Sequence, residues 1–353
     1  MKVAALDYEL PERLIASEPC AARDGARLMV LRRSEVEHRQ VREFAELVPS
    51  NALLIVNDTR VRRARVLGTK RESGGRVELL FLDRLEPGPD GRERWQAIAK
   101  SSKPLRAGAV IDCAFMQAEI EERRADGTVV TRLNVADGGD IEAAFERHGR
   151  MPIPPYLGRS DVALDAERYQ TVFARRTASA AAPTAGLHLS ASLLARLEQR
   201  GVALGKLELE IGLGTFRPVT SEELDDHVMH SERFEISAEL AQAVASARAR
   251  GGPVVAVGTT VVRALESAAD PERAGHVRAM KAETRLLIQP GYRFSVVDAL
   301  LTNFHVPRST LLALVAAFAG RDEVLAAYRW AVLDEYRFFS YGDAMWIPER
   351  RYS

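Results

Sequence analysis

The sequence has few cysteines, and this scarcity excludes two kinds of architecture. Among 353 residues only Cys20 and Cys113 occur, and they lie far apart in the chain. Two cysteines cannot complete a four-ligand zinc site by themselves, and one such pair makes a poor disulfide framework. We therefore expect a protein of a reducing compartment that does not depend on disulfide bonds or on a cysteine-rich metal site.

Long apolar runs and net charge are also missing. The longest apolar stretch, Leu311 to Gly320, is about half the length that a membrane-spanning helix needs. Near the start, Asp7 and Glu9 interrupt the chain before the apolar region of a signal peptide develops. These patterns predict a cytoplasmic protein that has no contact with a membrane. Lys plus Arg and Asp plus Glu both number 49, so composition does not indicate a strongly basic nucleic-acid-binding protein. A local basic patch is still compatible with this balance.

The sequence pattern of the chain is of two kinds, which occupy different segments. Residues 64–150 contain short strand-like runs separated by turn signals such as SGG, PGPDG and ADG, which favours a small antiparallel barrel or sandwich. The flanking segments alternate short apolar strands with amphipathic helices, which is typical of an α/β domain. Residues 1–60 alone are too short for a good core. We therefore predict a large α/β domain, residues 1–62 and 151–353, with residues 63–150 inserted as a small β-barrel domain.

Three apolar strand patterns of the α/β part run directly into polar turns. LLIV (53–56) precedes Asn57-Asp58-Thr59-Arg60, VVAV (254–257) precedes Gly258-Thr259-Thr260, and KLELEI (206–211) precedes Gly212-Leu213-Gly214-Thr215. In open α/β sheets, ligands bind outside the carboxyl ends of the strands. Each turn alone is compatible with a simple helix cap, but the set predicts one shared pocket.

These turns do not match the common phosphate-binding motifs. The Gly258 turn is suited to an anion at a helix N-terminus, but no lysine follows it as in a P-loop. Gly212 and Gly214 lack the third glycine of a dinucleotide fingerprint, because position 217 is arginine. Glu210 followed by alternating glycines weakly resembles the first motif of Rossmann-type methyltransferases, which gives an alternative function.

Four further segments combine polar and aromatic residues. Pro183 to His188 is a glycine-containing turn before a predicted helix, and its imidazole is either a proton acceptor or a loop hydrogen-bonding group. His227, His230 and Glu232 do not have the spacing of a zinc motif. Thr302 to His305, with Asp298 upstream, forms either a buried polar network or a ligand-contacting set. Tyr336 to Asp343 holds aromatics suited to base stacking, although Phe338 and Phe339 are more readily explained as core.

A dense basic run lies at the entrance to the predicted insert. It comprises Arg60, Arg62, Arg63, Arg65, Lys70 and Arg71. Such a run is usually a solvated strand face, and the other interpretation is a contact with a phosphate backbone.

Together, nine segments resemble one family, the S-adenosylmethionine:tRNA ribosyltransferase-isomerases of queuosine biosynthesis. In family order over nearly the whole chain they are NDTRV (57–61), ERYQTVFA (167–174), APTAGLH (182–188), GLGTF (212–216), HVMHSE (227–232), AVGTTVVRALES (256–267), PGYRF (290–294), LLTNFHVPRSTLL (300–312) and YRFFSYGDAM (336–345). The resemblance implies a large, barrel-like α/β domain with a β-barrel insert, and a monomer. It also implies an enzyme that uses S-adenosylmethionine as a substrate, acts on tRNA, and needs no metal or other cofactor.

The resemblance implies that the ribosyl part of the donor moves to 7-aminomethyl-7-deazaguanine at the tRNA wobble position and is isomerised to epoxyqueuosine. Adenine and methionine then leave. The alternatives are a Rossmann-type methyltransferase that uses the same donor, a paralogue with an altered substrate, and a non-catalytic RNA-binding protein. Departures from the family pattern at Leu189-Ser190, Glu210-Ile211 and Arg285 keep the paralogue open.

This reaction needs a general base, a general acid and a group that keeps an amine neutral. We expect His188 as base or proton shuttle, Asp58 near the sulfonium or amine, and His230 with Glu232 in the same proton network. The expected donor- or substrate-binding residues are Thr59, Arg60, Thr184, Gly186, Gly212, Gly214, Thr215, Thr259, Arg263, Glu266, Asp298, Asn303, His305, Arg337, Tyr341 and Asp343.

Overall fold

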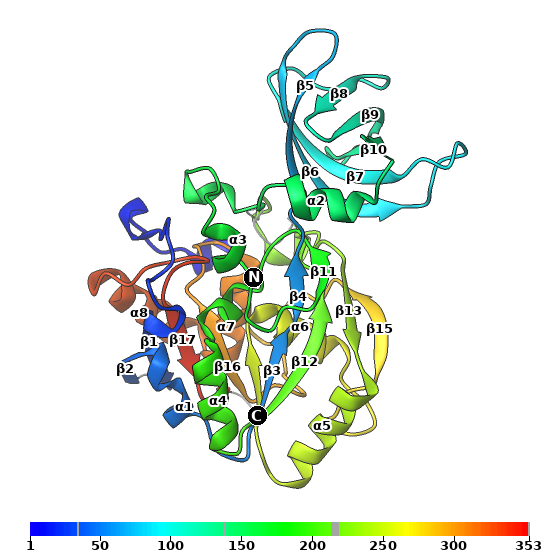
Figure 1. Ribbon diagram of the computed structural model, residues 1–353. Coiled ribbons are helices and arrows are strands. Elements are labelled where there is room, and N and C mark those ends of the chain that lie inside the picture. Colours follow the sequence, from blue (N-terminus) through cyan, green and yellow to red (C-terminus); the bar gives the residue numbers. More distant parts are fainter. Residues whose placement is uncertain (34, 137, 213–218, 352–353) are drawn as a thin grey trace.

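A computed structural model describes residues 1–33, 35–136, 138–212 and 219–351. Within them nine strands form one large sheet and six others form a closed antiparallel barrel (Figure 1). The predicted combination of a large α/β unit with a small antiparallel barrel is therefore confirmed. The large sheet does not close into a barrel, because its first and last strands, β15 and β2, do not pair with each other.

The large sheet has the strand order β15-β13-β12-β3-β14-β16-β17-β1-β2. Its central strands β12, β3, β14 and β16 are parallel to one another. The bounds of the strands are β1 Arg27–Arg32, β2 Glu35–Gln40, β3 Leu53–Asn57, β12 Ala203–Leu209, β13 Glu232–Ile236, β14 Val254–Val257, β15 Met280–Thr284, β16 Ala299–Asn303 and β17 Ala344–Ile347. This order differs from the 3-2-1-4-5-6 order of a Rossmann domain, which removes the fold basis of the methyltransferase alternative.

The central strands are apolar throughout because both of their faces are buried. In β3, Leu53 and Ile55 belong to one core cluster, whereas Leu54 and Val56 belong to another on the opposite face. The first face is covered by α5 (Ala238–Ala249), α6 (Thr259–Ser267), α7 (Thr310–Ala319) and α8 (Arg321–Leu333). The second is covered by α1 (Phe44–Leu47) and α4 (Ala191–Gln199).

Three of these helices have a serine side chain as their N-cap. The side chains of Ser190, Ser237 and Ser309 accept hydrogen bonds from the backbone of Leu193, Leu240 and Leu312, respectively. Serine is among the residues preferred at this position, because its side-chain oxygen satisfies a backbone N–H group that has no partner within the helix.

The barrel strands are β5 Arg65–Lys70, β6 Arg76–Leu85, β7 Arg94–Ser101, β8 Val110–Cys113, β9 Met116–Arg123 and β10 Val129–Val135. Trp95, Phe81 and Phe145 of helix α2 (Ile141–His148) fill its interior. These elements fall inside the range 63–150, whose status as a separate domain stays a prediction. The chain enters and leaves at one end of the barrel, where Arg65 N donates to Arg150 O.

A two-stranded sheet joins the barrel to the large sheet. It pairs β4 (Thr59–Val61), which follows β3 directly, with β11 (Arg176–Ser179). The barrel therefore stands on the edge where the central parallel strands end (Figure 1). A further short helix, α3 (Asp165–Arg168), lies between the barrel and β11 in the chain. Within the described residues no helix is both long and apolar enough to cross a bilayer.

Candidate active site

The carboxyl ends of the four central strands meet at one edge of the sheet. Asn57 ends β3 and Asp58 follows it, Gly258 and Thr259 follow β14, Gly212 follows β12, and Asn303 ends β16. The predicted convergence of these turns at one edge is therefore seen. Gly258 has φ 96°, a left-handed conformation that favours glycine, and it turns the chain from β14 into α6.

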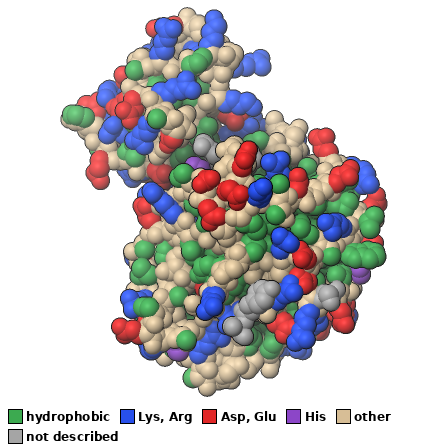
Figure 2. Space-filling model, turned by 180° about the vertical axis from the view of Figure 1, so that it is seen from behind, with side chains coloured by type: hydrophobic (Ala, Val, Ile, Leu, Met, Phe, Trp, Pro, Cys, Tyr) green, Lys and Arg blue, Asp and Glu red, His purple; other side chains and the backbone are tan. Residues whose placement is uncertain are grey.

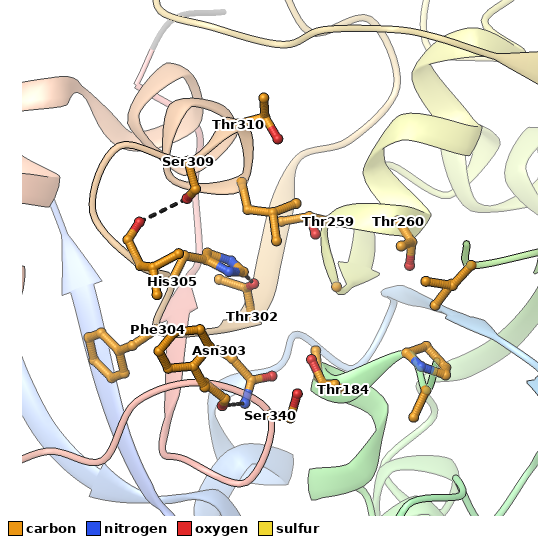
Figure 3. A pocket seen from close by; sticks show the side chains of 18 of the residues that line it. Thr184, Thr259, Thr260, Thr302, Asn303, Phe304, His305, Ser309, Thr310 and Ser340 are labelled. Atoms are coloured by element: carbon orange, nitrogen blue, oxygen red, sulfur yellow. Dashed lines mark hydrogen bonds between the residues drawn. The ribbon is translucent and has the colours of Figure 1, made fainter. Parts of the chain in front are cut away.

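A cavity of about 250 Å³, called here the main cavity, lies at this edge. It is bounded by the ends of β14 and β16, by the 3₁₀ helix η6 (Thr184–His188), and by the segments leading into α7 and β17. Figure 3 shows Thr184, Thr259, Thr302 and Asn303 around one common space. Hydroxyl and amide groups in a largely apolar hollow are suited to orienting a small organic ligand.

Asn303 connects the main cavity to His188. Its amide nitrogen lies 2.9 Å from the Phe339 carbonyl oxygen and 3.1 Å from His188 Nε2. Because a carbonyl oxygen only accepts, the nitrogen of the Asn303 amide has to face it, and the same nitrogen then donates to Nε2. Nε2 is therefore the unprotonated ring nitrogen, and the proton of the neutral imidazole is on Nδ1.

Burial keeps His188 neutral. The side chain is only 4% exposed, and burial lowers the pKa of His188 to about 4. The Asp343 carboxylate opposes this pKa shift and the Arg337 guanidinium adds to it. A neutral imidazole beside a cavity has the protonation state that a general base requires. To accept a proton at Nε2, however, His188 has to give up its contact with Asn303.

An aromatic pair forms part of the cavity wall. Tyr156 of the 3₁₀ helix η5 (Pro155–Leu157) stacks on Phe339, with ring centroids 4.1 Å apart. Phe339 has φ 71°, a conformation that L side chains rarely adopt, and strained backbone of this kind concentrates at functional sites. Phe338 is fully buried in the core, as expected, and Phe339 is partly buried, packs against the same core cluster and also lines the main cavity.

A second cavity, also of about 250 Å³, lies beside the first, and Ile211 lines both. It is bounded by Gly212 and Glu232 of the large sheet region and by Asp83 of barrel strand β6. Glu232 forms a buried ion pair with Arg263 of α6. The second cavity thus lies between the large sheet and the barrel.

Glu210, one of the positions noted above as a departure from the family pattern, lines this second cavity. Its carboxylate is 2.6 Å from Arg233 Nη2, and the same guanidinium contacts Asp83 of the barrel. Glu210 therefore belongs to an ion-pair network that spans the large sheet and the barrel.

Asp58 and His230 do not join the His188–Asn303 group. Asp58 is 1% exposed, its Oδ2 accepts from Arg175 Nε at 3.0 Å, and burial raises the pKa of its carboxyl. It stands at the predicted edge but lines neither cavity. His230 is exposed on the segment before β13. Of the four residues expected to face a single ligand, Asn303 lines the main cavity, and His188 is connected to that cavity through its contact with Asn303.

Two expected ligand-binding residues are structural instead. Asp298 precedes β16, at the opposite edge of the sheet, where it accepts from Val254 N and pairs with Arg248. Glu266 accepts hydrogen bonds from the backbone of the loop 295–297 and from the Tyr292 hydroxyl, and among the described residues it is not part of the lining of either cavity. Sequence proximity to a motif misassigned both, because helix α6 and strand β16 each extend well away from the cavity.

The remaining expected residues divide into three groups. Thr184 and Thr259 line the main cavity, as does His305, whose Nε2 lies 2.9 Å from Thr302 Oγ1. A second group lies around His188 or in the loops next to it. Arg337 and Tyr341 line a small hollow together with His188. Asp343 accepts hydrogen bonds from the backbone N–H groups of Arg27 and Arg337, and Gly186 packs closely on Phe173. A third group lies at the barrel junction: Thr59 contacts Ser179, and Arg60 pairs with Glu146. Gly214 and Thr215 lie outside the described residues.

Sequence reasoning missed Tyr156. It follows two prolines in PIPPYLGR (152–159), a pattern that indicates a rigid turn but gives no sign of a cavity wall. Only the stacking on Phe339, more than 180 positions later, places this ring at the site.

A cavity at the carboxyl edge of an α/β sheet, with a buried neutral imidazole beside it, has the features of an enzyme active site. A family model described as queuosine biosynthesis protein matches residues 3–347. A relative from Sorangium cellulosum named S-adenosylmethionine:tRNA ribosyltransferase-isomerase is 54% identical, over 98% of this chain and 98% of its own length. One of the same name from Anaeromyxobacter dehalogenans is 50% identical, over 99% of this chain and all of its own.

The crystal structure of an S-adenosylmethionine tRNA ribosyltransferase from Thermotoga maritima is similar as well. It is 34% identical, with a TM-score of 0.54, over 97% of this chain and 99% of the other. The chain belongs to the queuosine biosynthesis protein family of tRNA ribosyltransferase-isomerases, and it is an enzyme.

Proposed function

We propose that this enzyme transfers the ribosyl moiety of S-adenosylmethionine to 7-aminomethyl-7-deazaguanine at the wobble position of tRNA and isomerises it to epoxyqueuosine. Adenine and methionine are the released products. The nine motif segments and the names of the relatives support the proposal. The observation that carries it is the contact between His188 and Asn303 at a cavity formed by the carboxyl ends of the parallel strands.

The two neighbouring cavities fit a reaction with two different reactants. We assign the donor to the main cavity, whose threonine hydroxyls and aromatic wall suit a nucleoside. The tRNA base enters the second cavity, which lies between the large sheet and the barrel. Ile211 borders both, so the two ligands meet there.

The sulfonium of the donor acidifies its C5′ hydrogens, and a neutral base is needed to remove one. We assign this role to His188, once donor binding releases Nε2 from Asn303. The electrons of the C5′ carbanion break the C4′–O4′ bond and form a C4′=C5′ vinyl sulfonium, while O4′ becomes the carbonyl oxygen on C1′ as adenine leaves C1′ and takes a proton. The neutral aminomethyl nitrogen adds to C4′ and loses a proton, and the carbanion regenerated at C5′ attacks the C1′ carbonyl. The resulting C1′ alkoxide displaces methionine from C5′ as the epoxide closes. Glu232, which pairs with Arg263, is one of the carboxylates that line the second cavity, and we assign it to the incoming amine.

Product analysis distinguishes this function from the alternatives. The enzyme is incubated with donor and with tRNA that carries the aminomethyl base, and the small molecules are identified by mass. Free adenine and methionine support the proposal. S-adenosylhomocysteine would identify a methyltransferase, and an unconsumed donor with bound tRNA would identify a binding protein. Turnover only with a different base would identify a paralogue.

The assignment of donor and base to separate cavities has its own test. Thr259→Val, in the main cavity, should raise the KM for the donor more than that for tRNA. Glu210→Gln, at the rim of the second cavity, should do the reverse. The opposite pattern of KM changes would exchange the two assignments.

A further inference from the structure

The predicted basic run at the barrel entrance is not a free cationic surface. Arg60 pairs with Glu146, Arg62 with Glu142, Arg65 with Glu78, and Arg71 with Asp112. An arginine that already forms an ion pair with a carboxylate interacts less favourably with a phosphate group than an unpaired arginine does. Of this run, Arg63 and Lys70 alone have no carboxylate within ion-pair distance among the described residues, and Lys70 lies at the end of β5 that is far from the entrance.

Unpaired cations gather at the far end of the barrel. The β5–β6 turn (70–76) and the segment 100–109 that joins β7 to β8 hold six Lys or Arg and one acidic residue, whereas the whole chain is balanced. Five of these cations have no carboxylate within ion-pair distance among the described residues. They are Lys70, Arg76, Lys100, Lys103 and Arg106, called here the distal basic cluster.

Strand register brings these segments together. Thr69 pairs with Arg76 across β5 and β6, and Glu78 pairs with Lys100 across β6 and β7. The ammonium of Lys70 donates to the Lys103 carbonyl oxygen at 2.9 Å. Arg76, Lys100, Lys103 and Arg106 are all exposed. The cluster is therefore one continuous surface feature, and Figure 2 shows Lys and Arg side chains at the upper end of the barrel.

The position of the cluster relates it to the catalytic edge. The six residues of β5 carry the chain about 20 Å away from the junction at roughly 3.3 Å per residue. The barrel stands on the edge of the sheet where both cavities lie (Figure 1). An RNA whose loop reaches those cavities extends its stem away from this edge, alongside the barrel.

We propose that the distal basic cluster binds the phosphate backbone of the tRNA stem, away from the base that reacts. This inference rests on the proposed function for its partner. The contact supplies affinity without reading sequence, because Lys and Arg that meet phosphates release counterions regardless of the base. It accounts for how an enzyme without net charge holds a polyanion.

The test compares two double variants with equal loss of charge. Lys100→Gln/Lys103→Gln removes charge from the cluster. Arg200→Gln/Arg250→Gln removes the same charge from exposed positions after α4 and α5, at the opposite edge of the sheet. Binding of full-length tRNA is measured without donor over a range of salt concentrations, and thermal melting confirms that both variants fold.

The cluster variant should bind tRNA more weakly, on the order of 10-fold at 0.1 M salt, and its slope of log affinity against log salt should fall by about two. Its kcat at saturating tRNA should be unchanged. The control should match wild type in affinity and slope. Equal affinity and slope for wild type and the cluster variant would overturn the inference. Failure of the proposed function is distinguishable, because it would appear as absence of adenine release by wild type whatever the binding results.

Discussion

At the scale of single residues, the account depends on the neutral imidazole of His188. Because general acid–base catalysis contributes roughly 10²–10⁴-fold, His188→Ala and His188→Gln should each lose at least about 100-fold in kcat. His38→Ala, which changes an imidazole on β2 far from the cavities in the sheet order, is the control and should keep wild-type turnover. Circular dichroism and melting show whether the variants fold. Wild-type turnover by a folded His188 variant would remove this residue from the mechanism.

The tautomer of His188 gives a second residue-scale prediction. Nitrogen-15 NMR at pH 7 should show a protonated Nδ1 and an unprotonated Nε2, since Nε2 accepts from Asn303. With a pKa of about 4, the ring should not titrate between pH 8 and 5.5.

Asn303→Asp is the matched variant for this measurement. A carboxylate at this position accepts rather than donates, so the proton should move to Nε2 and the pKa of His188 should rise. Titration of wild-type His188 near pH 6.5, or the same tautomer in both proteins, would contradict the assigned hydrogen bond.

At the scale of elements, Glu266 fixes the loop before β16 to helix α6. Its carboxylate accepts from the backbone N–H groups of Ser295, Val296 and Val297 at 2.8–3.0 Å. Glu266→Ala should lower the free energy of unfolding by about 3 kcal/mol, because buried donors lose a charged acceptor. Glu266→Gln should lose less. Denaturant unfolding measures both, and a change in KM for the donor without loss of stability would restore Glu266 as a binding residue.

The sequence was informative about elements and less so about contacts between them. The apolar runs at 53–56 and 254–257 predicted buried strands, because this signal is local. The contacts of Glu266 and the stacking of Tyr156 on Phe339 join distant segments. Such contacts are set by strand order and helix direction, which no local pattern encodes.

The candidate site was predictable to the same extent. The rule that ligands bind beyond the carboxyl ends of parallel strands located the edge, and with it Thr184, Thr259 and Asn303. This rule did not distinguish the main cavity from the second cavity. Asp298, which was also predicted to bind a ligand, lies at the opposite end of the strands. The separation depends on Ile211 and on the docking of the barrel at Asp83, which are tertiary features.

At the scale of the whole molecule, buried histidines make stability depend on pH. Burial lowers the pKa of His188 to about 4 and that of His305 to about 3. Below pH 6.5, the ordinary pKa of histidine, these two side chains bind protons in the unfolded chain but stay neutral in the folded protein. The folded protein therefore loses stability as the pH falls. Between pH 7 and pH 5, each of the two histidines should lower the free energy of unfolding by on the order of 2 kcal/mol.

Denaturant unfolding at pH 7, 6 and 5 checks this prediction. His305→Gln removes one titrating group and keeps a polar side chain beside Thr302, so its stability should fall less steeply with acid than that of wild type. Identical pH profiles for the two proteins would show that His305 is not held neutral in the folded state.

The central claim is that this enzyme moves the sugar of its donor and not the methyl group. The most direct measurement uses S-adenosylmethionine labelled with ¹³C throughout the ribose, and in parallel a donor labelled only in the methyl group. After incubation with substrate tRNA, the RNA is digested and its nucleosides are weighed by mass spectrometry. The account predicts that ribose label enters the wobble nucleoside and that methyl label does not. Methyl label in the tRNA, with the ribose label left in a small molecule, would contradict it.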